Sequence, residues 1–194
     1  MIRSMNLINN INSLEILYVH GQDAEKFLQA IFYKNPDGDS LDGMAADIEE
    51  VTNSSSIETF AKVVRKSVGS KYPLIAITFS PVLKRANPKQ YAWKTIANNF
   101  DIIAPMTYWH GFVKLRSEKG AYDYTAQTIS KIKEYTNKDD IQIHLIGDGQ
   151  KTSKSEIVGF LRAAEDQMID GGVSLYPWYK PKAHQIDALS NSNF

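Results

Sequence analysis

The chain has 194 residues, 43% hydrophobic and 23% charged, and its 22 Lys and Arg are balanced by 22 Asp and Glu. This composition is typical of a globular domain and excludes disordered, collagen-like and coiled-coil proteins. A formal net charge of zero gives no basic field for a phosphate backbone, so we expect no general nucleic-acid binding. The absence of cysteine excludes disulfides, cysteine-ligated metals and thiol nucleophiles, while leaving the redox compartment open.

The sequence predicts no membrane span and no export signal. No run approaches the roughly 18 apolar residues that a spanning helix needs. The opening residues, MIRSMNLINNINSLEIL, are interrupted by asparagines and lack an apolar stretch of signal-peptide length. As it stands the sequence predicts a cytoplasmic protein, exported if an N-terminal segment is missing. We divide it into a polar N-terminal segment (1–13), one domain (14–180) and a C-terminal tail (181–194).

Short β-branched or apolar segments recur along the chain at the spacing of a strand–helix unit. They cover residues 15–19, 43–48, 74–79, 102–107, 141–146 and 173–176, and their starts lie 28 to 39 residues apart. Alternating strands and helices predict a mostly parallel sheet of the α/β class.

Capping signals mark the helices expected between these strands. In a capping box a serine oxygen and a glutamate satisfy each other's free backbone N–H groups. Asn before Pro marks a helix start, and Gly marks a helix end. In chain order the signals are the capping-box pair Ser55 and Glu58, the C-cap Gly69, the start pair Asn87 and Pro88, the capping-box pair Ser153 and Glu156, and the C-cap Gly171.

Two architectures fit these elements. A doubly wound sheet of six strands fits the length, whereas a (β/α)8 barrel needs about 250 residues and eight units, two more than are found. The long segment 110–121 follows the fourth strand. Long loops at that end of a parallel sheet are usually functional, and a surface insertion is the alternative.

The second strand ends in two carboxylates. Alternation places Asp47 and Glu49 on one face with Ala45, and the apolar Met44, Ala46 and Ile48 on the other. Two carboxylates this close raise each other's pKa, so that one can stay protonated near neutral pH and act as a general acid. The alternative is structural: Asp47 caps the loop and Glu49 pairs with a lysine at the rim.

Later strands add polar and aromatic side chains to the same end of the sheet. These are Tyr108 and Trp109 after the fourth strand, His144 and Asp148 on the fifth, and Ser174, Tyr176 and Trp178 on the last. Aromatic faces stack on sugar rings, and carboxylates and hydroxyls bind sugar OH groups. Their joint placement predicts a carbohydrate ligand, although each aromatic residue taken singly is more often part of a core.

Other chemistries lack their motifs. The Gly147–Gly149 turn has neither the third glycine of a dinucleotide site nor the lysine of a phosphate loop. The four histidines have no metal-ligand spacing, and no serine lies in a nucleophile elbow. We therefore expect no cofactor and no metal.

These segments resemble a known family. DGMAADIEE resembles the signature Asp-Gly-x-Asp-x-Asp-x-Glu of glycoside hydrolase family 18 at Asp42, Gly43, Asp47 and Glu49, with Ala45 replacing the middle aspartate. PMTYW is similar to that family's Met-x-Tyr strand, and Trp178 to the tryptophan ending its last strand. Over roughly residues 40–180, the segments DGMAADIEE, YPLIAITFSP, FDIIAPMTYWHG, IHLIGDG and GFLRAAEDQMIDGGVSLYPW look like those of uncharacterised bacterial glycosidase-like TIM-barrel proteins.

The resemblance implies an incomplete (β/α)8 barrel holding strands three to eight, and a glycosidase acting on a polysaccharide. It implies Glu49 as general acid and Asp47 as the carboxylate that orients the substrate's acetamido group, which would serve as the nucleophile. The substrate-binding residues expected from the resemblance and from the strand ends are Asp42, Tyr108, Trp109, His144, Asp148, Tyr176 and Trp178.

Alternative functions are kept open. A non-catalytic carbohydrate-binding or relic barrel is favoured by Ala45 and by the missing units. A doubly wound sheet that binds a small ligand is a third possibility. Unpaired first and last strands of an incomplete barrel predict self-association through the open edges.

Overall fold

The computed structural model describes the backbone of residues 16–20 and, with side chains, residues 24–49, 53–89, 91–149, 151–177 and 181–192. Strands and helices alternate through these ranges. Their bounds are β1 Ile16–His20, α1 Ala24–Ile31, β2 Gly43–Asp47, α2 Ser54–Val68, β3 Leu74–Phe79, η1 Lys84–Ala86, α3 Trp93–Asn99, β4 Ile102–Thr107, α4 Glu118–Thr136, β5 Gln142–Ile143, β6 Leu145–Asp148, α5 Lys154–Asp166, β7 Val173–Tyr176 and α6 Ala183–Ser190.

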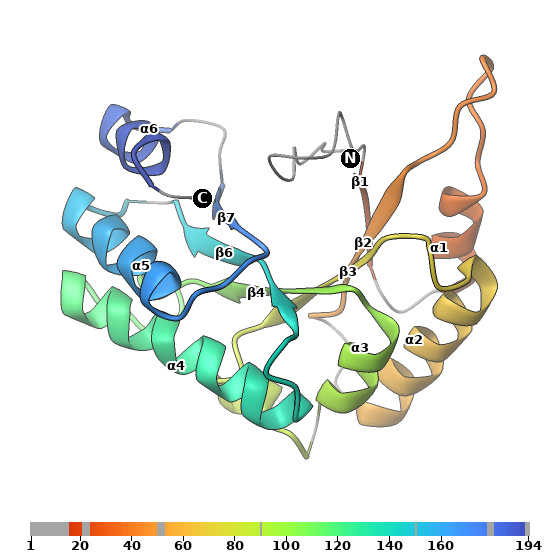
Figure 1. Ribbon diagram of the computed structural model, residues 1–194, viewed down its shortest axis with the longest axis horizontal. Helices are drawn as coiled ribbons and strands as arrows, with labels where there is room; N and C mark the ends of the chain where they lie inside the picture. The colour runs from red at the N-terminus through yellow and green to blue at the C-terminus, as the bar shows by residue number, and fades with distance from the viewer. Residues whose placement is uncertain are drawn as a thin grey trace.

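The strands form one parallel sheet in the order β1-β2-β3-β4-β6-β7, with β5 also paired to β4. The sheet curls into an arc with β1 and β7 at its two ends, and helices α1 to α5 cover its convex side (Figure 1). A doubly wound sheet would reverse its strand order at a central crevice, and this order follows the chain. The fold is therefore an incomplete (β/α)8 barrel.

The strand register decides which side chains face inward. A Cβ at Gly147 would touch Leu175 and Phe160 of α5, so Gly147 faces the helices and its neighbour Asp148 faces the concave side. Residues paired across parallel strands share a face. The pairs Asp148 with Tyr176, Ile146 with Met106, Met106 with Phe79 and Ile77 with Asp47 therefore carry the concave face across the sheet.

The concave face is apolar at depth and polar at the carboxyl ends of the strands. Its deeper residues Ala45, Ile75, Ile77, Ala104 and Ile146 are each at most 4% exposed. The polar and aromatic side chains come after them in the chain, which is the end of a barrel where active sites lie.

Three expected capping signals are wrong. Helix α2 is capped by Asn53, whose side-chain oxygen accepts the Ser56 N–H at 2.8 Å, so Ser55 is already helical and forms no box with Glu58. Asn87 and Pro88 start no helix, because Asn87 ends η1 and α3 begins at Trp93.

The expected end of α5 at Gly171 is also wrong, because the helix stops at Asp166 with Gln167 as its cap. A Cβ at Gly171 would overlap the Ile143 carbonyl, so glycine is needed there for a close backbone approach. The capping box of Ser153 with Glu156 and the Gly69 C-cap are confirmed.

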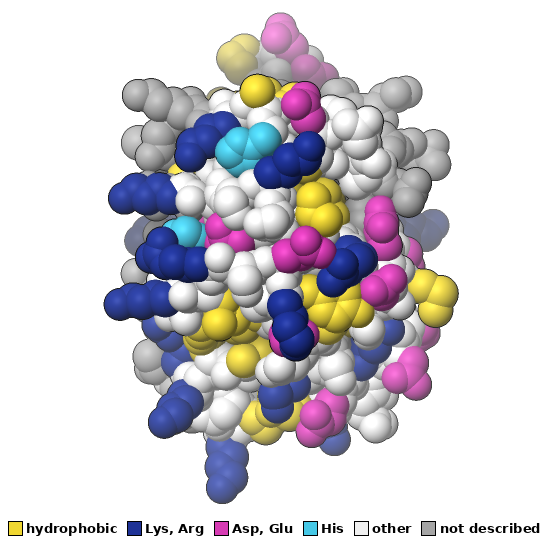
Figure 2. Space-filling model, turned by 90° about the vertical axis from the view of Figure 1, so that its left-hand side faces the viewer, with side chains coloured by type: hydrophobic (Ala, Val, Ile, Leu, Met, Phe, Trp, Pro, Cys, Tyr) yellow, Lys and Arg dark blue, Asp and Glu magenta, His cyan; other side chains and the backbone are white. Residues whose placement is uncertain are grey.

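Two further differences concern the C-terminal part. The strand expected over 141–146 is divided into β5 and β6 at His144. Residues 183–190, expected as part of a tail, form helix α6, which packs against α5. A groove of about 390 Å3 between these helices is lined by residues such as Val158, Leu161 and Ala188, on the side of the molecule drawn in Figure 2. Within the described residues, no helix is long and apolar enough to cross a membrane.

Candidate functional site

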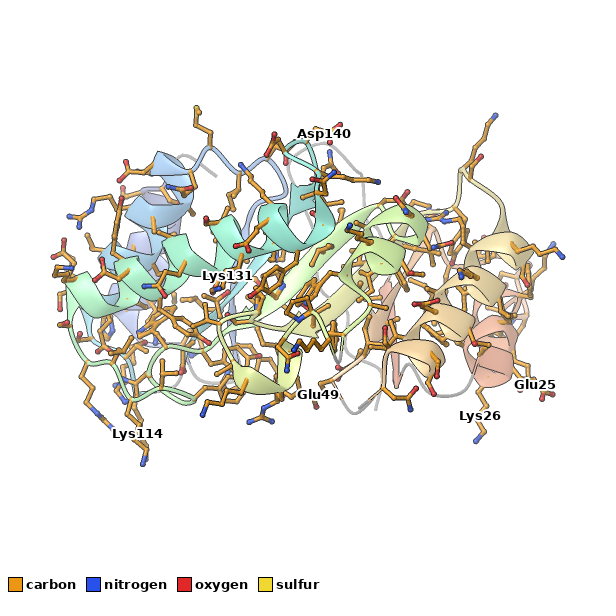
Figure 3. All side chains as sticks on the ribbon, turned by 90° about the horizontal axis from the view of Figure 1, so that it is seen from below. Glu25, Lys26, Glu49, Lys114, Lys131 and Asp140 are labelled. Atoms are coloured by element: carbon orange, nitrogen blue, oxygen red, sulfur yellow. The ribbon has the colours of Figure 1, made fainter. Side chains whose placement is uncertain are left out.

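The end of β2 supplies two carboxylates with different surroundings. Asp47 is 4% exposed, and its Oδ1 accepts the backbone N–H of Glu49 at 3.2 Å. Glu49 is partly exposed and lies at the edge of the molecule that also holds Lys114, opposite the edge with Asp140 (Figure 3). By accepting this N–H, Asp47 caps the loop after β2, as expected if the carboxylate has a structural role.

Tyr91 is a buried tyrosine near these carboxylates. Its hydroxyl is buried and donates to the Ile48 carbonyl at 3.0 Å. Burial raises the pKa of Tyr91, and the negative charges of Asp47 and Glu49 raise it further. The phenol is therefore a fixed, protonated donor next to the carboxylate pair.

A row of rings runs along the carboxyl ends of the strands from β3 to β7. Tyr176 stacks on Tyr108 with centroids 6.2 Å apart and ring planes 16° apart. Tyr108 contacts Phe112 at 5.1 Å, and Phe112 meets Phe79 edge-on at 5.9 Å. The guanidinium of Arg85 lies 4.4 Å above the Phe79 ring.

Tyr108 is the point at which the predicted site residues converge. Burial raises its pKa above the ordinary value, and electrostatic interaction with Tyr176, Asp148, Glu49 and Asp47 raises it further, in that order. The carboxylates at the ends of β2 and β6 therefore act on one phenol that follows β4 and stacks on the Tyr176 ring.

Asp148 connects the end of β6 to the loop after β4. Its Oδ2 accepts the Gly111 N–H at 2.7 Å, and a Cβ at Gly111 would lie 3.1 Å from the same oxygen. This bond holds the loop that follows Tyr108, so Asp148 contributes to the position of the tyrosine as well as to the charge around it.

The sequence indicated Glu156 only as part of a helix cap. Its Oε2 accepts the N–H and Oγ–H of Ser153, and its Oε1 accepts from Trp109 Nε1 at 3.2 Å and His110 Nδ1 at 2.7 Å. Burial raises the pKa of Glu156, but the hydrogen bonds from Ser153 and His110 outweigh burial and lower it below the ordinary value. One buried carboxylate thus joins the start of α5 to the loop after β4.

The same network determines the tautomer of His110. Its Nε2 lies 2.8 Å from Arg116 NH1. A guanidinium only donates, so Nε2 accepts and the ring proton lies on Nδ1, which donates to Glu156. No sequence spacing links His110 to Glu156, 46 residues away, and only the fold brings them together.

Several predicted residues lie elsewhere. Asp42 immediately precedes β2 at the amino end of the sheet, on the order of 23 Å from Glu49 at a rise of about 3.3 Å per residue. Its charge, after the larger effect of burial, helps to raise the pKa of Tyr72 to about 12. Trp109 is fully buried, and its ring stacks on Phe160 at 5.1 Å. The position of Trp109 is that of a packing residue.

His144 faces the concave side but is 3% exposed, with both ring nitrogens occupied. Nδ1 donates to the Gly171 carbonyl at 2.8 Å, so Nε2 accepts from the Ser174 hydroxyl at 3.0 Å. Burial lowers the pKa of His144, although the Gly171 bond partly offsets this effect. The remaining predicted residue, Trp178, lies outside the described residues.

No group of three His, Cys, Asp or Glu side chains in the described part of the chain could hold a metal ion.

Comparison with protein-family models and with curated protein sequences finds no match. Among solved structures, the fold is similar to a beta-glucuronidase from an uncultured Clostridium species, with a TM-score of 0.53 and 12% sequence identity. The match covers 76% of this chain and 31% of that protein. The chain thus spans less than a third of a glycosidase with a TIM barrel, and at this identity the likeness shows the fold alone.

Proposed function

We propose that the carboxyl-end cluster is a glycosidase site acting on a polysaccharide, with Glu49 as the general acid. The observation that supports it most is the placement of Asp47, Asp148 and Tyr176 on the concave face at the carboxyl ends of their strands, with the Tyr108 ring stacked on Tyr176. The resemblance of DGMAADIEE to the glycoside hydrolase family 18 signature supports the same assignment. The fold shared with a beta-glucuronidase agrees with it.

The two carboxylates of β2 have separate roles in this proposal. Asp47 is buried and hydrogen-bonded to the Glu49 backbone, so it supplies a fixed negative charge beside the substrate. Glu49 has the greater exposure and delivers the proton to the leaving oxygen. The Tyr108 phenol stays protonated and donates to a substrate oxygen, while the Tyr91 hydroxyl remains hydrogen-bonded to the Ile48 carbonyl. A substrate acetamido group serves as nucleophile, so no second enzymic nucleophile is needed.

The stacked pair of Tyr108 and Tyr176 supplies the binding surface. Tyr176 is 49% exposed, which leaves ring area for the C–H face of a sugar. A sugar on this surface lies next to the carboxylates that act on Tyr108.

A non-catalytic carbohydrate-binding site is the second candidate. Asp47 and Asp148 each accept a backbone N–H, at 3.2 and 2.7 Å, which is what structural carboxylates do. Ala45 also stands where the family 18 signature has an aspartate.

The deciding experiment replaces Glu49 by Gln, which keeps the shape of the side chain but delivers no proton. With soluble N-acetylglucosamine or glucose oligosaccharides, we expect hydrolysis to fall about 10²–10⁴-fold while binding is retained. Asp47→Asn lowers the rate as well. The matched control is Glu25→Gln on α1, far from the site (Figure 3), which leaves the rate unchanged. Equal rates in the wild type and Glu49→Gln would remove Glu49 from the mechanism, and sugar binding without turnover in the wild type would favour the binding site.

A further inference from the structure

Arg85 is an exposed cation held in place by aromatic rings. It lies in η1, just after the carboxyl end of β3. Its guanidinium is 4.4 Å from the centre of the Phe79 ring and 5.6 Å from that of Phe112. Contact with two aromatic rings restrains an otherwise flexible side chain, and such contacts contribute attraction even at exposed sites.

The hydrogen-bonding groups of Arg85 are not used within the described part of the chain. No carboxylate or carbonyl there accepts from its guanidinium, although a guanidinium offers five N–H donors in a rigid fork. The side chain is therefore positioned by its ring contacts, and its N–H donors are not used by the described residues.

Arg85 lies close to the candidate site. Phe112 contacts both the guanidinium, at 5.6 Å, and the Tyr108 ring, at 5.1 Å. One ring thus separates Arg85 from the tyrosine on which the carboxylates converge. A saccharide chain lying along the row from Tyr176 toward Phe79 would reach the Arg85 fork.

Three loops at this end of the sheet are basic. The loops after β3, β4 and β6 contain no Asp or Glu, and they carry Lys84, Arg85, Lys89, Lys114, Arg116 and Lys151, whereas the loop after β2 contains Glu49 and Glu50. In Figure 2, Lys and Arg side chains gather along the left margin of the face and acidic side chains lie mainly to its right. That left margin belongs to the edge on which Figure 3 places Glu49 and Lys114.

The opposite end of the sheet has the reverse sign. Its loops carry Asp37, Asp39, Asp42, Asp101, Asp139, Asp140 and Asp170, against Lys34, Lys71 and Lys138. A chain without net charge is thus polarised along its strands. A field of this kind attracts anions toward the carboxyl end and weakens as salt is added.

We propose that the saccharide bound at this site carries carboxylates, as a uronic acid does, and that Arg85 binds one of them. The inference rests on the proposed function, since it names the substrate class of the same site. A planar carboxylate matches the guanidinium fork with two parallel hydrogen bonds. The sugar ring that bears it stacks on the neighbouring aromatic row, and the surrounding lysines favour its approach.

The test measures binding of matched oligosaccharides by calorimetry at low salt. The probes are tetramers of β-1,4-glucuronate and of α-1,4-galacturonate, their carboxyl-reduced counterparts, and a cellotetraose sulfated at C6. We expect a uronate tetramer to bind about 10-fold more tightly than its reduced counterpart, and the difference to shrink as salt is raised. Arg85→Met removes this preference and leaves affinity for the reduced tetramer unchanged, and Arg85→Lys keeps part of it.

The control is Lys66→Met, which removes an exposed cation at the last turn of α2 and leaves the preference intact. Thermal melts of each variant check folding, which we expect to be unaffected because Arg85 is exposed. Equal binding of charged and reduced tetramers would overturn this inference and leave the proposed carbohydrate site standing. A preference that survives Arg85→Met, or equal binding of the sulfated tetramer, would also overturn it. Absence of binding to every tetramer would overturn this inference, and the proposed function would fall with it only if N-acetylglucosamine oligosaccharides also do not bind.

Discussion

Two arginines at opposite ends of the sheet differ in what surrounds their guanidinium groups. Arg65 of α2 lies at the amino end with its side chain 15% exposed. It donates to the carbonyls of Asn99 at 2.7 Å and of Gly69 and Tyr72 at 2.9 Å, and to Asp101 at 2.7 Å. Arg85, at the carboxyl end, rests on two rings and donates to no acceptor within the described residues.

We therefore regard Arg65 as a structural arginine and Arg85 as a candidate ligand-binding arginine. Arg65 uses its donors to close the loops where β3 and β4 begin, and Asp101 extends the closure by accepting the Leu74 N–H at 2.7 Å. Burying carbonyls without partners is costly, so this end is built for stability. At the carboxyl end, in contrast, the proposed ligand would bind the Arg85 donors and the aromatic rings.

The largest effect that we expect from this difference between Arg65 and Arg85 is on the stability of the fold. Replacing Arg65 by Met removes four charge-assisted hydrogen bonds and leaves three carbonyls without this partner. We expect the free energy of unfolding in urea to fall by about 3 kcal/mol. Arg85→Met is the matched control, with an expected change below about 0.5 kcal/mol. Equal losses for the two variants would contradict the distinction.

A smaller loss is expected from Glu156→Gln, which tests whether the carboxyl end also has a structural part. The amide places an NH2 group against donors from Ser153, Trp109 or His110, so at least one hydrogen bond becomes a repulsion. We expect unfolding in urea to cost about 2 kcal/mol less than in the wild type. Glu118→Gln, which breaks the exposed pair with Arg162, is the control and changes stability by about 0–1 kcal/mol.

The same variant predicts a pH dependence. The pKa of Glu156 is lower in the folded chain than its ordinary value of 4.5. Its contribution to stability is therefore present above about pH 4.5 and is lost as the pH falls through the folded pKa. Melting curves from pH 7 to pH 3 should show the gap between the wild type and Glu156→Gln closing on acidification. A gap that stays constant over this range would show that the ionised carboxylate is not what the network needs.

The smallest effect concerns His144, on the concave face near the middle of the sheet. Burial lowers its pKa below the ordinary value of 6.5, so the unfolded chain takes up the proton first as the pH falls. The stability contributed by neutral His144 is present above about pH 6.5 and is lost below it, toward the folded pKa. His144→Gln should flatten this part of the stability profile. Ser174→Ala should leave the slope in place, since the imidazole still titrates.

The sequence predicted the strands well because their pattern is local. The bounds expected for 74–79, 102–107 and 173–176 coincide with β3, β4 and β7, where apolar and β-branched residues form continuous runs. The single strand expected over 141–146 failed at His144. Its side chain bonds to Gly171 and Ser174, 27 and 30 residues away, and no local pattern contains those partners.

Capping signals were less reliable because several residues compete for one helix end. Ser153 and Glu156 form their box, but Asn53 displaced Ser55 at the start of α2. Both are good caps by residue type. The tertiary fold, which sets where α2 must begin after β2, decided between them.

The candidate site divides in the same way. Alternation along each strand determined from sequence alone that Asp47, Asp148 and Tyr176 share a face, because side chains in a strand alternate whatever surrounds them. Sequence alone did not reveal that Trp109 turns into the helix layer, that Glu156 binds His110, or that Arg85 lies over Phe79. Those contacts depend on how loops after different strands pack against one another. The alternation of side chains between the two faces of a strand is a property of the backbone. The partners of each loop side chain, in contrast, are determined only when the curled sheet brings distant segments together.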